Sequence, residues 1–332
     1  MKHIKKIDAP EPYMTITWQV NNFCNYSCSY CNPGNWMGDN INEQPVEQYI
    51  SSLQRIVDKY LAVGYKNFKF FFSGGEPTAW KNFLPICEWI KETLPDSTIA
   101  VNTNLSRPLG WWEKTYHLFD DVVASFHVEY AKKDRYIENS LFLCDKLNYL
   151  SSKMLLHDER FWEVVEFGNE LKELLPNYFI EWTPLYDEMT ADASPWEYKD
   201  PDKQKFIEEN NIEMDFTIDK PYKDSGVVSY TYYDDGTKVP CNSNDIIVHR
   251  QNFFRGWDCD VGDCIFISPD GRVSMASCGV SPPLGHILKD IDNIGPKTVT
   301  CTKYHCHCGT DIIIPKRKRE LPEHEVLAVG TD

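Results

Sequence analysis

The sequence predicts an α/β protein, a partial (βα)6 TIM-type barrel with a small cysteine-rich C-terminal module. Three observations lead to this prediction. Six strand-like segments follow one another before residue 186, and most are followed by a segment with helical periodicity. Polar residues gather at the carboxyl ends of these strands, and after about residue 228 the pattern changes to short strands and turns. Such alternation is typical of parallel strands with crossover helices, in a barrel or a doubly wound sheet.

The elements are expected in a regular order. The first strand covers residues 13–20, where apolar and polar residues alternate. A helix is expected from about Pro45 to Leu61, because proline is common in the first turn of a helix and Gly64 is placed to end it. Further strands are expected at 68–73, 98–104, 121–129, 153–157 and 178–185, and further helical segments at about 84–94, 111–119, 137–147 and 161–175.

Polar side chains end these strands. They are Asn21, Ser73 to Glu76, Asn102, Asn104, Ser125, His127, Glu129, His157, Glu181 and Thr183. In barrels the carboxyl ends of the strands carry the chemistry, so this distribution favours a barrel that opens onto a site. Strand ends also lie near solvent, which explains polar residues there without any site.

Changes in composition set the expected domain boundaries. Residues 13–186 form the barrel, and residues 187–227 are a polar, acidic and proline-containing linker or irregular excursion with a short helix. Residues 228–315 form the second module, which holds seven of the 12 cysteines. Residues 316–332 begin with the basic run KRKR and are expected to be a solvated tail.

Charge and hydropathy restrict the function. The chain of 332 residues carries 34 Lys and Arg against 50 Asp and Glu, a formal net charge of −16, which disfavours extended contact with a phosphate backbone. The N-terminus lacks the apolar stretch of a secretory signal, and no run approaches the roughly 18 apolar residues of a membrane span. We therefore expect a cytoplasmic protein with no membrane partner, whose cysteines bind metal or carry chemistry.

The loop after the first strand contains the motif Cys24-x3-Cys28-x2-Cys31. Three thiolates on a short loop can bind three corners of a cubane iron–sulfur cluster, which leaves the fourth iron for an exogenous ligand. One alternative is a zinc site completed by His127 or His157, and another is a set of structural thiols.

A second motif, SGGEPT at 73–78, ends the second strand. Gly74 and Gly75 let the backbone approach a ligand closely, and their carbonyls, with Glu76, can accept hydrogen bonds from an ammonium group. The alternative is a flexible strand-to-helix turn in which Pro77 opens the helix.

Together, CNYSCSYC and SGGEPT resemble the radical S-adenosylmethionine (radical SAM) superfamily, over about residues 13–186. The resemblance implies a [4Fe–4S] cluster on the three loop cysteines, with SAM chelating the unique iron. It implies an enzyme that reductively cleaves SAM to a 5′-deoxyadenosyl radical, which abstracts hydrogen from a substrate, and a reducing partner such as flavodoxin or ferredoxin. The residues expected to contact this cofactor are Tyr30, Gly74, Gly75, Glu76, Asn102, Asn104, Ser125 and His127.

The C-terminal cysteines form a second pattern. Cys259-x4-Cys264-x13-Cys278 brackets a predicted hairpin, and CTKYHCHC adds Cys301, Cys306 and Cys308. The arrangement resembles the SPASM and twitch auxiliary-cluster modules of radical SAM enzymes, although its terminal spacing departs from the two-cluster type. This resemblance implies one auxiliary [4Fe–4S] cluster. Its expected ligands are Cys259, Cys264, Cys278 and Cys306, with Cys308 or Cys301 as alternatives to Cys306, and a zinc site with His305 or His307 is the competitor.

These observations favour a radical SAM enzyme with an auxiliary module that acts on a peptide or a small molecule. Two other functions remain open: a zinc-stabilised binding protein, and a radical SAM enzyme that modifies a nucleotide or a tRNA base. Cys87 and Cys144 fall at apolar helix positions and are expected to be core residues.

Overall fold

The computed structural model describes residues 2–31, 44–175, 178–185, 197–210, 229–241, 243–289, 291, 293–306 and 308–319. Its centre is a run of six parallel strands that neighbour one another in chain order. They are β2 (Tyr13–Gln19), β3 (Asn67–Ser73), β4 (Thr98–Thr103), β5 (Asp121–Phe126), β6 (Tyr149–Leu156) and β7 (Phe179–Pro184). All six strands expected from the sequence are confirmed, and the sheet is open because β7 does not pair with β2.

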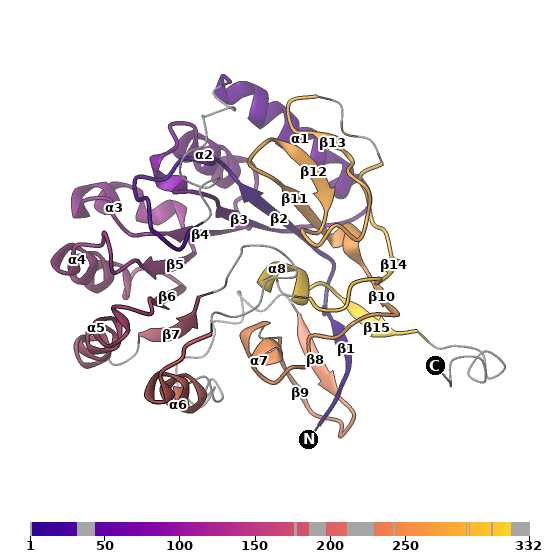
Figure 1. Cartoon of the computed structure of the whole chain (residues 1–332). Coiled ribbons are helices and arrows are strands. Elements are labelled where there is room, and N and C mark those ends of the chain that lie inside the picture. Colours follow the sequence, from indigo (N-terminus) through magenta and orange to yellow (C-terminus); the bar gives the residue numbers. More distant parts are fainter. Residues whose placement is uncertain are drawn as a thin grey trace.

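Helices follow these strands as the periodicity predicted. Figure 1 shows α2 to α6 along one side of the strands. Of these, α2 to α5 connect neighbouring parallel strands, and α6 follows the last one. The helices are α1 (Val46–Ala62), α2 (Phe83–Thr93), α3 (Leu109–Thr115), α4 (Lys133–Leu143), α5 (Phe161–Leu174) and α6 (Pro201–Asn210), with the short η2 (Pro77–Ala79) and η3 (Tyr116–Leu118). The short helix expected in the linker is α6; most of the remaining linker lies outside the described residues.

The two faces of β2 differ in chemistry. Ile16 and Trp18 alternate with Thr15 and Thr17, so the two pairs point to opposite faces of the sheet. The Trp18 ring packs against Tyr49 of α1 at 5.7 Å between centroids, which identifies the helix side. The threonines therefore lie on the face away from α1, and both are buried.

The C-terminal segment adds a hairpin to the same sheet. It consists of β11 (Cys264–Ile267) and β12 (Arg272–Met275), and β13 (Gly285–His286) pairs with β12. β11 pairs in parallel with β2, from Cys264 opposite Thr15 to Ile267 opposite Trp18. The hairpin expected from the sequence is therefore confirmed, and it continues the sheet of the first 185 residues.

A second sheet joins the two ends of the chain. Its order is β14-β10-β15-β1-β8-β9. The bounds are β1 (Ile4–Asp8), β8 (Tyr230–Tyr233), β9 (Lys238–Pro240), β10 (Trp257–Cys259), β14 (Val299–Thr300) and β15 (Lys316–Lys318), with helices α7 (Ser243–Val248) and α8 (Gly309–Ile312) and the short η5 (Val261–Asp263) nearby. The expectation of a solvated tail from residue 316 is wrong for residues 316–318, because β15 is hydrogen-bonded between β1 and β10.

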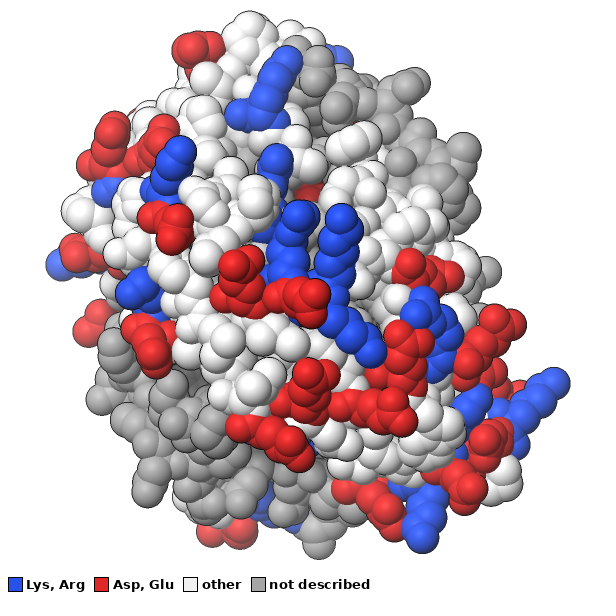
Figure 2. All heavy atoms as spheres, turned by 90° about the vertical axis from the view of Figure 1, so that its left-hand side faces the viewer, with Lys and Arg blue, Asp and Glu red and all other residues white. Residues whose placement is uncertain are grey.

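The described surface carries both signs of charge. On the face shown in Figure 2, Lys and Arg side chains lie beside Asp and Glu side chains. In the described part of the chain, none of the helices combines the length and the apolar character that crossing a bilayer requires.

Candidate functional site

The three-cysteine loop leaves the carboxyl end of β2. The Cys31 N–H donates to the Cys28 carbonyl at 3.0 Å, which closes a tight turn. Cys28 is buried, whereas Cys24 and Cys31 are half-buried. The Cys24 sulfur accepts from the backbone N–H of Tyr26 at 3.4 Å. The turn thus brings Cys28 and Cys31 close together, and all three cysteines are at least partly buried.

The thiols lie within electrostatic range of one another. Burial raises the pKa of Cys24 to about 11, and the neighbouring Glu76 and Cys31 contribute in the same direction. Burial likewise raises the pKa of Cys28 to about 12, with Glu129, Cys24 and Cys31 adding to the shift. Without metal these thiols are therefore protonated at neutral pH, and metal binding has to displace their protons.

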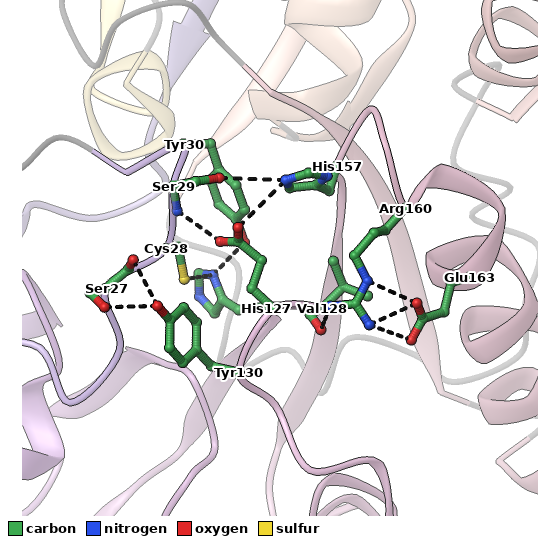
Figure 3. Close-up of polar contacts among 11 residues, drawn as sticks. Ser27, Cys28, Ser29, Tyr30, His127, Val128, Tyr130, His157, Arg160 and Glu163 are labelled. Carbon is green, nitrogen blue, oxygen red and sulfur yellow. Dashed lines mark hydrogen bonds and ion pairs between the residues drawn. The ribbon is translucent and has the colours of Figure 1, made fainter.

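His127, which follows β5, contacts the loop directly (Figure 3). Its Nδ1 lies 2.8 Å from the Tyr30 hydroxyl and 3.4 Å from the Cys28 sulfur. The His127 and Tyr30 rings stack with 6.0 Å between centroids and 9° between planes. Burial lowers the pKa of His127 to about 4, so the imidazole is neutral at neutral pH. We expected His127 to contact SAM, and in this structure its side chain holds the cysteine loop.

A second set of contacts ties the loop to β5 and β6. The Ser29 N–H donates to the Glu129 carboxylate at 2.7 Å. His157, after β6, lies 3.6 Å from Glu129 and 3.5 Å from the Ser29 hydroxyl (Figure 3). Tyr130 and Ser27 make a further hydroxyl contact of 2.8 Å. The loop is therefore fixed on one side by residues that end two neighbouring strands.

The second motif packs against the end of β2. The Gly75 N–H donates to the Asn21 carbonyl at 3.1 Å, and the Glu76 N–H donates to the Phe23 carbonyl at 2.8 Å. Gly74 has φ +131°, and a Cβ there would lie 2.8 Å from the Asn21 oxygen. The two glycines thus let the backbone of this turn pack closely against the end of β2, beside the cysteine loop.

The Glu76 side chain accepts several hydrogen bonds within the protein. It is buried, and its carboxylate accepts from the Thr78 N–H and hydroxyl, the Thr103 hydroxyl and the Asn104 N–H, at 2.6–3.1 Å. Burial raises the pKa of Glu76, and these hydrogen bonds act in the opposite direction. The carboxylate therefore stabilises the ends of β3 and β4, which differs from the ammonium-binding role that we expected.

The remaining expected SAM contacts lie at the ends of β4 and β5. The Ser125 hydroxyl donates to the Asn102 side chain at 3.2 Å. The Asn104 amide donates to Asn25 at 2.9 Å and approaches the Cys24 sulfur at 3.8 Å. A polar cavity of about 110 Å³ lies between this part of the loop and the start of α4; Asn25, Tyr26, Asn104, Ser106, Tyr130 and Arg135 are among its lining residues.

Two buried polar atoms near the loop lack hydrogen-bond partners among the described residues. They are Oδ1 of Asn21, beside the second motif, and Nδ1 of His157. A buried polar atom without a partner is costly, so these atoms are suited to a polar ligand at this edge of the sheet. Sequence patterns indicated both residues as polar strand ends but gave no sign that they would be unpaired.

The C-terminal cysteines form a separate cavity. Four thiols line it, together with Asp311 and Lys316; they are Cys259, Cys278, Cys301 and Cys306. Burial raises the pKa of Cys259 to about 11 and of Cys278 to about 12, and Cys301 contributes to both shifts. Cys306 is coupled in the same way to Cys259 and Cys278. The cavity thus brings together three of the four expected ligands, Cys259, Cys278 and Cys306. The fourth thiol in its lining is Cys301.

Cys264 is placed differently from this set. It is fully buried in β11, and it does not belong to the lining of the cavity. Cys308 directly precedes α8, and its sulfur contacts the Thr310 hydroxyl at 3.1 Å.

Two further cysteines lie in the helical layer. Cys87 is fully buried on α2, and Cys144 follows α4 half-buried at the edge of the same core. His305 lines the cavity, and His307 lies outside the described residues.

The donor chemistry of both sites fits iron–sulfur clusters. Cysteine thiolates are the usual ligands of such clusters, and each thiolate binds a different iron. Within the described residues no three Cys, His, Asp or Glu side chains approach closely enough to hold one metal ion. Cluster thiolates do not need to meet at one ion, so the two cysteine sets are compatible with this spacing.

Comparison with known proteins gives partial matches. No protein-family model matches the chain. GTP 3′,8-cyclase of Actinobacillus pleuropneumoniae (serotype 5b, strain L20) is 29% identical over 105 residues, 31% of this chain and 30% of the cyclase. The radical SAM cyclopropyl synthase TigE of Paramaledivibacter caminithermalis is 24% identical over 225 residues, 60% of this chain and 46% of TigE. These matches support the expected resemblance to the radical SAM superfamily. The matches span less than half of either relative.

A solved structure has a similar fold. Native anSMEcpe with bound AdoMet has a TM-score of 0.50 and 15% identity, and the match covers 85% of this chain and 79% of that one. The similarity therefore includes the C-terminal segment as well as the parallel strands. Both sequence relatives are enzymes by name, which supports the expectation that this chain is an enzyme.

Proposed function

We propose that this protein is a radical SAM enzyme with one auxiliary iron–sulfur cluster, which acts on a peptide or a small molecule. The observation that carries the proposal is the loop of three neighbouring, partly or fully buried cysteines beside the Gly-Gly-Glu turn at one edge of a parallel sheet. We further infer that the open sheet is a partial TIM-type barrel, because its strands neighbour one another in chain order.

Cys24, Cys28 and Cys31 would hold the first [4Fe–4S] cluster. With SAM bound, such a cluster supplies a 5′-deoxyadenosyl radical by reductive cleavage. The chain itself positions the loop: His127 and Tyr30 support the Cys28 side, and Asn104 approaches Cys24. Placement and exclusion of water are the contributions expected of the protein at a reactive cofactor.

SAM would bind beside the second motif. The free Oδ1 of Asn21 and the backbone of Gly74 and Gly75 are the groups best placed to accept hydrogen bonds from its ammonium. Asn102 and Ser125 stay candidates for its ribose or carboxylate, since both lie at strand ends on the same edge.

The auxiliary cluster would use the four thiols that line the C-terminal cavity. We therefore propose Cys259, Cys278, Cys301 and Cys306 as ligands. Cys264 is left out because it does not line the cavity, although it lies within electrostatic range of Cys278. The hairpin between β11 and β12 supports the comparison with a SPASM or twitch module, because it separates the first two ligands.

The charge distribution supports a small substrate. The net charge of −16 opposes a nucleic-acid backbone, and basic side chains on the face in Figure 2 are bordered by acidic ones. A flavodoxin or ferredoxin stays the proposed electron source.

The proposal is tested by anaerobic reconstitution. We expect about eight iron atoms per wild-type chain, about four after alanine replacement of Cys24, Cys28 and Cys31, and about four after replacement of the cavity cysteines. Dithionite and SAM should give 5′-deoxyadenosine with wild type and none with the loop variant. Cys264→Ser is the matched control and should keep the wild-type iron content.

Two outcomes would contradict the proposal. Protein that contains zinc and no iron–sulfur absorbance would establish a zinc-stabilised protein. Loss of about four iron atoms in Cys264→Ser would return Cys264 to the ligand set.

A further inference from the structure

The C-terminal cavity contains a buried lysine that the proposed ligand set does not use. Lys316 of β15 lines the same cavity as the four thiols. Only 2% of it is exposed, and among the described residues no other Lys or Arg is buried. Burying an ammonium is costly unless an opposite charge or several acceptors compensate, so the position requires an explanation.

Hydrogen bonds account for part of the compensation. The Lys316 ammonium donates to the carbonyls of Asp311 and Ile312, at 2.7 and 2.8 Å. These carbonyls belong to the short helix α8, whose last carbonyls lack intrahelical partners. The two contacts fix the ammonium at the wall of the cavity without neutralising its charge.

No carboxylate in the described part of the chain lies within ion-pair distance of this ammonium. The nearest acidic residue in the lining, Asp311, is engaged elsewhere: its carboxylate accepts from the Ser277 N–H and hydroxyl and the Cys278 N–H, at 2.8–3.1 Å. The positive charge of Lys316 therefore faces a cavity lined by four thiols and by apolar side chains, with the less buried Lys303 and His305 also in its lining.

The surroundings keep water away from this charge. The Lys316 ammonium lies over the ring of the buried Phe254, with 4.9 Å between Nζ and the ring centroid. Val261 and Ile314 line the same cavity. Charges interact more strongly in such an environment than at the surface, because neither solvent nor salt screens them.

We propose that Lys316 is the resident counter-cation of the cysteine cavity and raises the reduction potential of the cluster bound there. The inference rests on the auxiliary cluster of the proposed function. Four thiolates make the occupied site anionic, and one electron from the reductant makes it more negative. A fixed positive charge therefore favours the reduced form over the oxidised form.

The experiment isolates the auxiliary cluster. The full-length parent carries alanine at positions 24, 28 and 31, so any remaining cluster belongs to the C-terminal cavity. Iron per chain is measured first, and the midpoint potential then follows from a dithionite titration monitored by electron paramagnetic resonance. We expect Lys316→Met to lower the potential by at least 59 mV, a tenfold change in the one-electron equilibrium. Lys316→Arg keeps the charge and should stay near the parent.

The matched control is Lys318→Met. It removes the same charge from an exposed position two residues along β15 and should leave the potential unchanged. If Lys316→Met does not fold, Lys316→Gln removes the charge with a polar side chain, and the same decrease is expected.

The outcomes test the auxiliary cluster and the role of Lys316 separately. A parent without iron would overturn the auxiliary cluster, and the role of Lys316 with it. A parent with about four iron atoms whose potential is unaffected by Lys316→Met or Lys316→Gln would overturn the role of Lys316 alone. An equal decrease of the midpoint potential in Lys316→Arg would indicate that the packing of Lys316, and not its charge, affects the cluster. That result would also reject the inference.

Discussion

Glu76 illustrates how the side chain of a motif residue can support the structure around a site. Its carboxylate connects η2, through Thr78, with the end of β4, through Thr103 and Asn104. Asn104 in turn approaches the Cys24 sulfur. A charged group in this position stabilises the site because four donors surround it, each of which needs an acceptor.

Glu76→Gln tests this role. The amide nitrogen is itself a donor and would face donors in the protein, so we expect the free energy of unfolding to fall by about 2–4 kcal/mol. Urea unfolding of anaerobically prepared protein measures it. Glu88→Gln on the exposed side of α2 is the control and should change stability by less than about 0.5 kcal/mol. Equal stability of the two variants would show that the hydrogen bonds of Glu76 are dispensable.

His127 has a comparable role for the first cysteine loop. Replacement by phenylalanine keeps a ring beside Tyr30 but removes the Nδ1 contacts to Tyr30 and Cys28. Partners behind metal ligands commonly contribute about 10–100-fold to metal affinity, so iron should be lost to a chelator about tenfold faster or more. The time course of iron release measures this. The exposed His117→Phe is the control; identical time courses would contradict the role of His127.

Among the elements, the contact between β2 and the turn after β3 determines the geometry of the site. Gly74→Ala would place a Cβ 2.8 Å from the Asn21 carbonyl and would force a residue with a side chain into φ +131°. We expect stability to fall by about 1–3 kcal/mol and SAM binding to weaken. Thermal unfolding and SAM titration measure the two effects.

Gly110→Ala is the matched control for Gly74→Ala. Gly110 lies in α3, and the nearest atom to an added Cβ is a flexible Glu113 oxygen at 3.8 Å. Alanine favours helices over glycine by about 1 kcal/mol, so this variant should be neutral or more stable. If the two variants have the same thermal stability, the prediction that close packing at Gly74 stabilises the protein is wrong.

The individual elements could be predicted from sequence because local periodicity determines them. The apolar stripe of α1 indicates its buried side, and the structure confirms it. The alternation in 13–20 correctly predicts a strand, but not its burial, because both faces of β2 are buried. The pairing of β11 with β2 joins residues about 250 positions apart, and no local pattern encodes it. Lys316 stands in a run of four basic residues, the usual pattern of a solvated segment, so its burial gave no signal either.

The candidate site was predictable to the extent that motif spacing encodes it. The three loop thiols and the glycines of the second motif lie together as expected. Side-chain direction was not predictable, since it depends on partners from other strands: Glu76 turns to Thr103, and His127 turns to Tyr30. That Cys301 lines the C-terminal cavity and Cys264 does not depends on the path of the chain after the hairpin.

At the scale of the whole molecule, the two predicted modules share one structure. β11 hydrogen-bonds to β2 along its whole length, and β1 is held between β8 and β15. Helix α1 adds a further link, because the Tyr60 hydroxyl donates to the Gly262 carbonyl at 2.6 Å. The Tyr65 hydroxyl donates to Asp263 at 2.6 Å. The C-terminal segment is therefore part of the packing of the parallel strands.

This packing predicts that the parallel strands do not fold alone. A chain ended after residue 228 exposes the hydrogen-bonding edge of β2 and removes both partners of β1. It also removes the buried residues Ile265, Ile267 and Val273 from the common core. We expect this chain to be aggregated or unfolded, measured by soluble yield, size-exclusion chromatography and far-ultraviolet circular dichroism.

A chain ended after Arg319 is the control for this truncation. It keeps every described strand and helix, so its circular dichroism and iron content should match those of the full chain. A shorter chain, 1–228, that stayed soluble and monomeric and retained about four iron atoms would contradict the prediction. The C-terminal module would then be an addition to a self-sufficient domain, and the parallel pairing of β11 with β2 would contribute little to the stability of the first site.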